Sequence, residues 1–279
     1  MSAANKPKVA IIYDFDGTLS PRNMQEYNFF PELGILPREF WEEANVNAKR
    51  DNADPILSYL NLMLEKASSS RKVRTTRDAF VEFGKGVEFF EGVEGWFERI
   101  NRVGKEFGLI VEHYIISSGL REMIEGTSIY RYLKCVFAST YMYDQNGVAK
   151  YPGIAVNFTT KTQFLFRINK GILEVHDSEG VNRYIPLDER PIPFSRMVYI
   201  GDGSTDIPCM KLTKDLGGHS IVVYKRGKHN EAQELLKQNR VNFVAPANYA
   251  ENSNLDKQVR ALLKKIAADE ELRRLVKVK

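Results

Sequence analysis

The most constraining feature of this sequence is a set of short, unbroken apolar runs. The first extends from Val9 to Tyr13 and stops abruptly at Asp14, and four further runs cover residues 109–116, 134–138, 197–200 and 220–224. Apolar runs that do not alternate with polar residues are typical of strands buried on both faces of a parallel sheet. Helical patterns, such as residues 93–103, separate several of the runs. The sequence therefore predicts an α/β fold with a doubly wound, mainly parallel sheet, whose catalytic groups gather at the carboxyl ends of the strands.

Residues 21–89 differ from the rest of the chain. They hold apolar residues at helical spacing without a convincing strand, and three prolines divide them into short helices: Pro31, Pro37 and Pro55. A helical insert directly after the first strand predicts a second, smaller domain, although it could instead extend the core. We expect a core domain of residues 1–20 and 90–279 and a helical cap domain of residues 21–89.

Four further segments have recognisable patterns. Residues 68–76 are polar and predict an exposed loop, and the Asn146-Gly147 pair between aromatic and apolar residues predicts a hairpin. Residues 172–195, rich in proline and charge, predict a loop excursion. Beyond Leu255, apolar residues at helical spacing predict an amphipathic terminal helix whose basic side is a solvated face.

Composition excludes several classes of protein. A length of 279 residues, with 43% hydrophobic and 27% charged residues, fits one or two globular domains and excludes a disordered chain. The net charge of +4 is too small to require nucleic acid or a membrane as a partner. Cys135 and Cys209 form neither a disulfide framework nor a metal-binding pair. The apolar start is too short for a signal peptide and no stretch approaches the roughly 20 residues of a membrane helix, so we expect a cytoplasmic protein.

Two pairs of aspartates follow two of the apolar runs. Asp14 and Asp16 lie in the segment DFDGT, directly after the first run, and Asp202 and Asp206 lie in GDGSTD, directly after residues 197–200. Carboxylates this close repel each other, which raises the pKa of one of them and favours a divalent cation nearby. Four carboxylates at one edge of a sheet form an oxygen-only site, which suits Mg²⁺. The alternatives are solvated turn carboxylates and, for Asp206, a cap on the helix that follows.

Hydroxyls and a lysine complete the pattern. The segment ISSG, with Ser117 and Ser118, follows another apolar run, and Ser117 could hydrogen-bond an anionic oxygen. Lys161 precedes a helical run, where its charge would add to the partial positive charge of a helix N-terminus in an arrangement that suits phosphate. Lys170, near the end of the same run, is the second candidate for this role.

The ordered set DFDGT, ISSG, a lysine at a helix start and GDGSTD resembles the haloacid dehalogenase superfamily of phosphotransferases. The resemblance is strongest to the phosphoserine-phosphatase-like branch, which has a helical cap after the first motif, and it covers nearly the whole chain. It implies that Asp14 is a nucleophile that forms an aspartyl-phosphate. It also implies that Asp16 protonates the leaving alcohol and then deprotonates the attacking water.

The same resemblance implies the remaining site residues. Mg²⁺ would be held by Asp14, by Asp202 and by the backbone carbonyl of Asp16, with Asp206 as a ligand or directly behind one. The substrate phosphoryl group would be bound by a set of four residues: Ser117, Ser118, Lys161 and Thr205.

The resemblance implies a Mg²⁺-dependent phosphatase that hydrolyses a small phosphomonoester, so the expected partner is a small phosphorylated metabolite. Two departures from the family pattern argue against phosphoserine: Asn23 stands near the position of a substrate-binding glutamate, and Thr205 replaces an asparagine. The alternatives are a phosphomutase or phosphotransferase with the same intermediate, and a non-catalytic binding protein on the same fold. The sequence predicts no particular oligomeric state.

Overall fold

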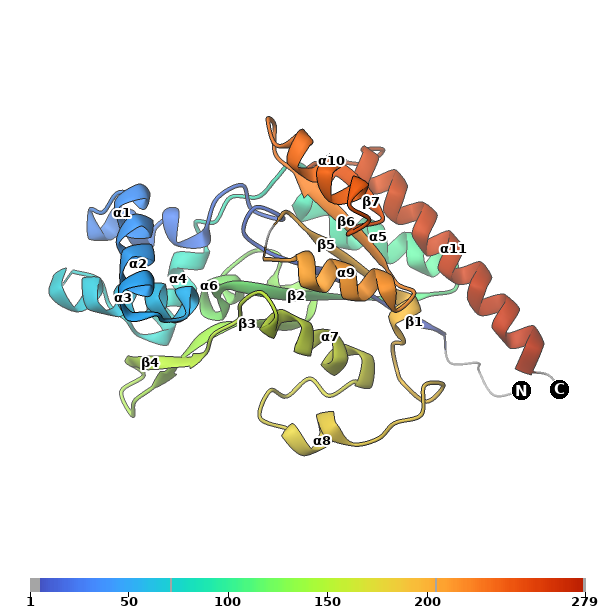
Figure 1. Ribbon diagram of the computed structural model, residues 1–279, viewed down its shortest axis with the longest axis horizontal. Coiled ribbons are helices and arrows are strands. Elements are labelled where there is room, and N and C mark those ends of the chain that lie inside the picture. Colours follow the sequence, from blue (N-terminus) through green and yellow to red (C-terminus); the bar gives the residue numbers. More distant parts are fainter. Residues whose placement is uncertain (1–5, 71, 204, 278–279) are drawn as a thin grey trace.

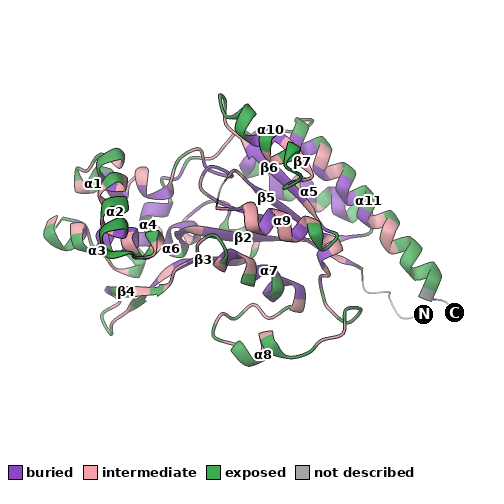
Figure 2. Ribbon diagram, viewed as in Figure 1, coloured by how far each residue is buried: buried purple, intermediate pink, exposed green. Residues whose placement is uncertain are grey.

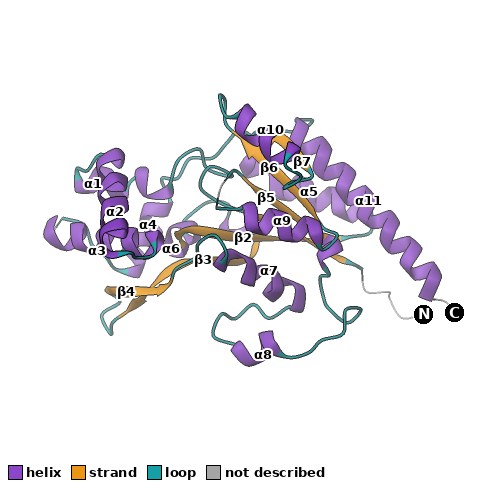
Figure 3. Ribbon diagram, in the orientation of Figure 1, coloured by secondary structure: helices purple, strands orange, loops and turns teal. Residues whose placement is uncertain are grey.

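A single twisted sheet lies at the centre of the molecule, with helices on both faces and a group of helices beyond one end (Figures 1 and 3). The computed structural model describes residues 6–70, 72–203 and 205–277. Within them the sheet has seven strands in the order β4-β3-β2-β1-β5-β6-β7, all parallel except β4, which is antiparallel to β3. The strands are β1 (Lys8–Tyr13), β2 (Ile110–Leu120), β3 (Leu133–Tyr143), β4 (Ala149–Ile154), β5 (Met197–Gly201), β6 (His219–Tyr224) and β7 (Phe243–Pro246).

The helices fall into an inserted group and a group that flanks the sheet. The inserted group is α1 (Phe29–Leu33), α2 (Pro37–Asp51), α3 (Pro55–Ser70) and α4 (Arg77–Gly84), preceded by the 3-10 turn η1 (Met24–Glu26). The flanking group is α5 (Val93–Glu106), α6 (Arg121–Glu125), α7 (Thr160–Lys170), α8 (Ser178–Asn182), α9 (Ile207–Asp215), α10 (His229–Lys237) and α11 (Asn254–Lys277). Two further 3-10 turns are η2 (Tyr130–Tyr132) and η3 (Phe194–Arg196).

Each face of the sheet buries its own apolar cluster, which is why the apolar runs show no alternation. Along β1, Val9 and Ile11 point to the cluster that contains side chains of α5 and α11. Ala10 and Ile12 point to the opposite cluster, with side chains of α7, α9 and α10. Figure 2 shows the central strands, such as β1 and β5, as the most continuously buried part of the molecule. This confirms the predicted doubly wound α/β fold with a mainly parallel sheet.

A helical insertion lies between β1 and β2, as predicted. Its helices pack on the extended end of β3, where the Phe80 and Tyr141 rings stack with centroids 5.4 Å apart. The Tyr141 hydroxyl donates to the Leu60 carbonyl at 2.7 Å. Backbone hydrogen bonds also join the insertion to the β3–β4 hairpin, from the Arg77 amide to the Gly147 carbonyl and from the Ala149 amide to the Thr75 carbonyl. The insertion is therefore fastened to the sheet at several points.

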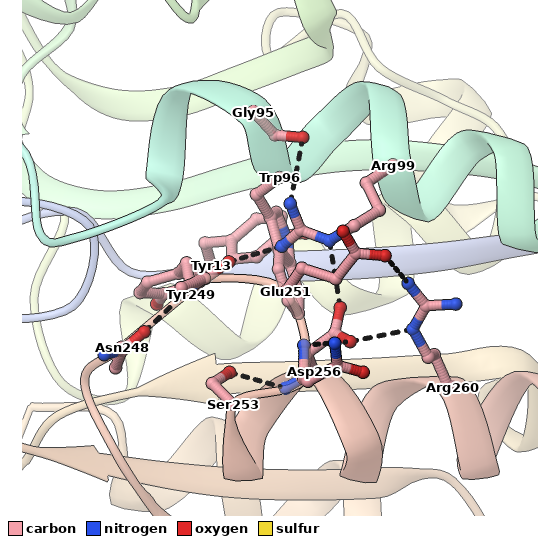
Figure 4. Close-up of polar contacts among 12 residues, drawn as sticks. Tyr13, Gly95, Trp96, Arg99, Asn248, Tyr249, Glu251, Ser253, Asp256 and Arg260 are labelled. Carbon is pink, nitrogen blue, oxygen red and sulfur yellow. Dashed lines mark hydrogen bonds and ion pairs between the residues drawn. The ribbon is translucent and has the colours of Figure 1, made fainter.

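An ion-pair network joins α5 to α11 on the face of the sheet that these two helices cover (Figure 4). The fully buried Asp256 accepts from Arg99 at 3.1 Å and from Arg260 at 2.8 Å. Burial would raise the pKa of Asp256, but the two guanidinium groups hold it below its ordinary value. Arg99 also donates to the Tyr249 carbonyl, and the Tyr249 hydroxyl donates to the Thr18 carbonyl at 2.9 Å. The network thus supports the turn that follows β1.

The structure corrects several predicted boundaries. Helix α3 continues to Ser70, so the predicted loop at residues 68–76 begins later, and the loop at residues 172–195 contains the short helix α8. The edge strand β7 was not predicted from the sequence. The hairpin at Asn146-Gly147 and the terminal helix are confirmed. Among the described residues, no helix combines the length and the apolar character that crossing a membrane requires.

Candidate active site

The turn after β1 depends on a glycine. The Asp14 amide donates to the Ile200 carbonyl at 2.9 Å, which carries the ladder between β1 and β5 one residue past the strand. Gly17 then turns the chain with φ of 84°, a conformation that disfavours residues with a Cβ. A Cβ at Gly17 would also collide with the Asp202 carboxylate. The turn and the end of β5 therefore meet at a point where only glycine fits.

Three carboxylates meet at the carboxyl edge of the sheet. Oxygens of Asp14, Asp202 and Asp206 lie within 4.8 Å of one another. Asp14 is 4% exposed and Asp206 is fully buried. Solvated turn carboxylates would not be buried in this way. Asp206 stands at the N-cap position of α9 but makes no side-chain cap hydrogen bond, so the alternative role as a helix cap is wrong.

Lys161 is the buried cation of this cluster. It lies in the first turn of α7 and is fully buried, with its Nζ 2.8 Å from Asp14 Oδ1 and 2.7 Å from Asp206 Oδ1. Burial alone would lower the pKa of Lys161, but the contacts with Asp14 and Asp206 outweigh it and raise that pKa. The lysine is therefore positively charged at neutral pH. Lys170 instead donates to the carbonyls of Val181 and Arg183.

One ammonium group does not balance the cluster. Burial and the nearby charge of Asp206 raise the pKa of Asp14 to about 7 and the pKa of Asp202 to about 6. One oxygen of Asp206, Oδ2, is buried and has no hydrogen-bond partner among the described residues. An unpaired buried carboxylate oxygen is costly. The cluster therefore lacks positive charge at the point where its carboxylates meet.

The donor set fits a divalent cation with a preference for oxygen. Mg²⁺ takes carboxylate oxygens at about 2.0–2.1 Å, so ligands on opposite sides of the ion lie about 4 Å apart. The 4.8 Å spread of the three carboxylates requires only small side-chain movements to reach this spacing. Asp14, Asp202 and Asp206 could therefore hold such an ion, and the unpartnered oxygen of Asp206 would gain a partner.

Asp16 lies beside the cluster and not in it. Its Oδ1 accepts from the Met24 amide at 2.9 Å, which ties the carboxyl group to the first turn of the insertion. Burial, and then the charge of Asp14, raise the pKa of Asp16 well above its ordinary value. A raised pKa favours the protonated form of a carboxyl group, and this form can act as a general acid.

A β-bulge places the two serines of the ISSG segment. Ser117 pairs with Ala138 and Leu120 with Ser139, so Ser118 and Gly119 form the extra residues of the bulge. The strand thus runs past the serines, where the sequence predicted that it would end. The Ser117 hydroxyl oxygen accepts from the Gly119 amide at 3.0 Å, which leaves its proton available to an anion. The Ser118 hydroxyl is buried without a partner among the described residues, and its carbonyl accepts from the Tyr59 hydroxyl of the insertion.

A cavity of about 580 Å³ opens above these groups. Of the predicted site residues, Asp14, Asp16, Asp202, Ser117, Ser118 and Thr205 line it. Asn23 also lines it, with its Nδ2 donating at 2.7 Å to Glu26, which also accepts from the Trp41 indole. Lys161 and Asp206 do not line the cavity, but Lys161 contacts both Asp206 and the lining residue Asp14. Ser204, part of the GDGSTD segment, lies outside the described residues.

The geometry agrees with a comparison to known families. A family model described as haloacid dehalogenase-like hydrolase matches residues 11–211, which begin within β1 and include the insertion and β5. This chain belongs to the haloacid dehalogenase-like hydrolases. An uncharacterized protein of Borreliella burgdorferi is 30% identical to this hydrolase, in an alignment that covers 88% of this chain and 93% of that protein.

Solved structures with the same fold include phosphoserine phosphatases. A substrate-bound phosphoserine phosphatase complex is 15% identical to the hydrolase, with a TM-score of 0.56 over 92% of this chain and 99% of that one. A phospho-aspartyl intermediate analogue of phosphoserine phosphatase is 18% identical, with a TM-score of 0.52 and the same coverage. At these identities the likeness shows a shared fold, with a helical insertion between β1 and β2.

Three residues of the site were not predicted from the sequence of this hydrolase. The Tyr199 hydroxyl donates to Asp206 Oδ1 at 2.8 Å, and Lys225 and Lys228 line the cavity. Tyr199 lies inside an apolar run and gave no signal of a polar role. Lys225 directly follows the run at residues 220–224, so the rule that led to Asp14 and Asp202 could have found it.

Proposed function

We propose that this hydrolase is a Mg²⁺-dependent phosphatase that cleaves a small phosphomonoester through an aspartyl-phosphate. The observation that carries the proposal is the cluster of Asp14, Asp202 and Asp206, whose negative charge is only partly neutralised. Lys161 is the cation that pairs with Asp14 and Asp206. A bound Mg²⁺ would supply the positive charge that keeps the carboxylates ionised and offsets the charge of the phosphoryl group.

In the first half of the proposed reaction, a carboxylate oxygen of Asp14 attacks phosphorus. The new bond joins this oxygen to phosphorus while the bond from phosphorus to the ester oxygen breaks. Asp16, whose raised pKa favours the protonated form, gives its proton to the departing oxygen. Lys161 stabilises the negative charge that is shared between Asp14 and the phosphoryl oxygens.

In the second half, water hydrolyses the aspartyl-phosphate. Asp16, now ionised, takes a proton from the water while the water oxygen bonds to phosphorus. The bond between phosphorus and the Asp14 oxygen breaks. The products are inorganic phosphate and the original form of both aspartates. Ser117, Ser118 and Thr205 line the cavity and are proposed to hold the phosphoryl oxygens by hydrogen bonds during both steps.

We also propose that residues 21–89 act as a cap domain. Asn23 and Ile56 bring this segment to the wall of the cavity, and the Met24 amide holds Asp16. A cap in this place would exclude water from the first step and help to select the substrate. Phosphomonoesters of metabolite size, and not folded phosphoproteins, are the proposed substrates.

The proposal is tested by phosphate release from a generic aryl phosphate with Mg²⁺ and with EDTA. Wild-type protein should release inorganic phosphate in a yield equal to that of the aryl alcohol, and EDTA should abolish the release. Asp14→Asn should be inactive, whereas Asp215→Asn, at an exposed aspartate paired with Lys211, should retain wild-type activity. Equal activity of the wild type and Asp14→Asn would refute the proposed nucleophile. Alcohol released without inorganic phosphate would indicate a phosphotransferase.

A further inference from the structure

The cavity above Asp14 extends well beyond the phosphoryl site. Its volume of about 580 Å³ lies in the range of pockets that bury drug-sized ligands, about 300–1,000 Å³. A phosphoryl group at Asp14 and Ser117 would fill only one end. The other end is formed by the carboxyl end of β6 and by α10. Figure 1 shows α10 beside β6 and β7, well away from the cap helices α2 and α3.

The wall of this second arm is apolar. Val223 of β6 and Ala232 of α10 are buried at its base, and Leu235, one turn further along α10, is half-buried beside them. Ile207, the first residue of α9, follows Asp206 directly and lines the same cavity. Hydrocarbon or ring atoms of a leaving group would bury apolar surface against this wall.

Two lysines stand along the same arm. Lys225 donates to the Pro21 carbonyl at the start of the insertion. The charge of Lys225 lowers the pKa of Asp202, so Lys225 stands at the end of the arm nearer to the carboxylate cluster. Lys228 stands further out, at the N-cap position of α10, with its Nζ 2.6 Å from Glu231. The side chains of Lys228 and Glu231 are 61% and 70% exposed. Ion pairs this exposed contribute little, so an anionic group of a ligand can take the place of Glu231.

We propose that the substrate of this phosphatase carries a second anionic group on an apolar arm. The phosphoryl group would lie at Asp14, the apolar part against Val223, Ala232 and Leu235, and the distal carboxylate or phosphate at Lys228, with Lys225 on the path between them. This inference rests on the proposed phosphatase function and specifies the class of its substrate.

The test uses matched aryl phosphates. One probe carries a carboxylate on an alkyl arm opposite the phosphate, the second is its methyl ester, and the third carries a phosphonate in place of the carboxylate. The arm is lengthened by one methylene at a time. Wild-type protein with Mg²⁺ should hydrolyse both acidic probes with a lower KM than the ester at one preferred arm length, with similar kcat. The acidic probe with the lower KM indicates whether the natural distal group is a carboxylate or a phosphate.

Variants of Lys228 and Lys237 test whether Lys228 is responsible for the lower KM of the acidic probes. Lys228→Met should raise the KM of the acidic probes about threefold to fivefold and leave the ester unchanged, the size expected for an exposed charge pair. Lys228→Glu should reverse the preference. Lys237→Met is the control, because Lys237 is exposed on α10 and does not line the cavity.

The outcomes separate the two proposals. Phosphate release with the same KM for acid and ester, or an acid preference that survives Lys228→Glu, overturns the inference and leaves the phosphatase function intact. No phosphate release from any probe with Mg²⁺ present overturns both.

Discussion

Gly17 combines two requirements at a single residue. Its φ of 84° is strained for any residue with a Cβ, and a Cβ there would collide with Asp202. Gly34 has a similar φ of 70°, but nothing lies within 4 Å of the place where a Cβ would be added. The two glycines therefore separate the effect of backbone strain from that of the collision.

Gly17→Ala and Gly34→Ala should each cost about 1–2 kcal/mol of unfolding free energy, because each forces a Cβ into the left-handed region. Only Gly17→Ala should also lose the proposed phosphatase activity and the proposed Mg²⁺ binding, since it displaces Asp202. Thermal unfolding and titration calorimetry with Mg²⁺ measure the two effects. Loss of Mg²⁺ affinity in both variants, or in neither, would contradict the role given to this contact.

Two lysines of α7 provide a second test at the scale of residues. Lys161→Met removes the cation bound by Asp14 and Asp206, and it should lower kcat by about 10²-fold or more. It should also lower the unfolding free energy in EDTA by about 3 kcal/mol, because two buried carboxylates lose their partner. Mg²⁺ should restore part of that loss. Lys170→Met, which removes hydrogen bonds to the C-terminal end of α8, should keep wild-type kcat. The reverse pattern would assign the role to Lys170.

Residues whose role follows from their place in a strand could be predicted from the sequence. Asp14 and Asp202 follow apolar runs directly, and parallel strands bring the two runs to one edge. The contacts of Ser118 could not be predicted, because they depend on a bulge whose position is set by pairing with β3. Nor could those of Tyr199, because a tyrosine in an apolar run gives no sign of a carboxylate on the same face.

Individual elements show the same division between local pattern and tertiary context. The central strands β1 and β5 were found from their apolar runs alone, since both of their faces are buried. The edge strand β7 has four residues, only one of them buried, and ends in a proline, so no run marks it. The last turn of α3 is a serine run whose helical state follows from the helix before it.

One substitution can remove a backbone hydrogen bond between the insertion and the β3–β4 hairpin. Arg77 is the first residue of α4, where proline is tolerated, and Thr76 before it is already extended. Arg77→Pro should therefore keep the helix but remove the hydrogen bond from the Arg77 amide to Gly147. The lost hydrogen bond should lower the local stability of the hairpin by about 1 kcal/mol, so the amides of residues 144–149 should exchange with solvent about fivefold faster.

Arg77→Ala is the matched control for this link. It removes the ion pair with Glu125 but retains the amide, so the hairpin should exchange at the wild-type rate. Equal exchange in Arg77→Pro and Arg77→Ala would show that this hydrogen bond does not hold the hairpin.

At the scale of the whole molecule, a buried histidine links folding to pH. His113 is 1% exposed, with Nδ1 3.0 Å from the Tyr13 hydroxyl and Nε2 3.2 Å from Asn101 Oδ1. Asn101 Oδ1 can only accept, so Nε2 carries the proton of the neutral ring and Nδ1 accepts from the Tyr13 hydroxyl, whose oxygen in turn accepts from the Trp96 indole. Burial lowers the pKa of His113 to about 3.

Because the unfolded chain binds a proton at His113 near pH 6.5 and the folded chain does not, acid favours unfolding. The contribution of this group to stability should be complete above pH 6.5 and fall by about 1.4 kcal/mol per pH unit below it, toward pH 3. Chemical unfolding in EDTA at several pH values measures the slope, and His113→Gln should show a smaller one. A His113 ring resonance that titrates near pH 6.5 in the folded protein would contradict this account.

The most direct test of the central claim is to locate the phosphoryl group during turnover. Wild-type protein mixed with an aryl phosphate and Mg²⁺, quenched rapidly in acid and digested, should yield one peptide heavier by a phosphoryl group, with the modification on Asp14. The modified peptide should be absent with EDTA and in Asp14→Asn. Phosphoryl transfer to another residue, or steady phosphate release by Asp14→Asn, would contradict the account.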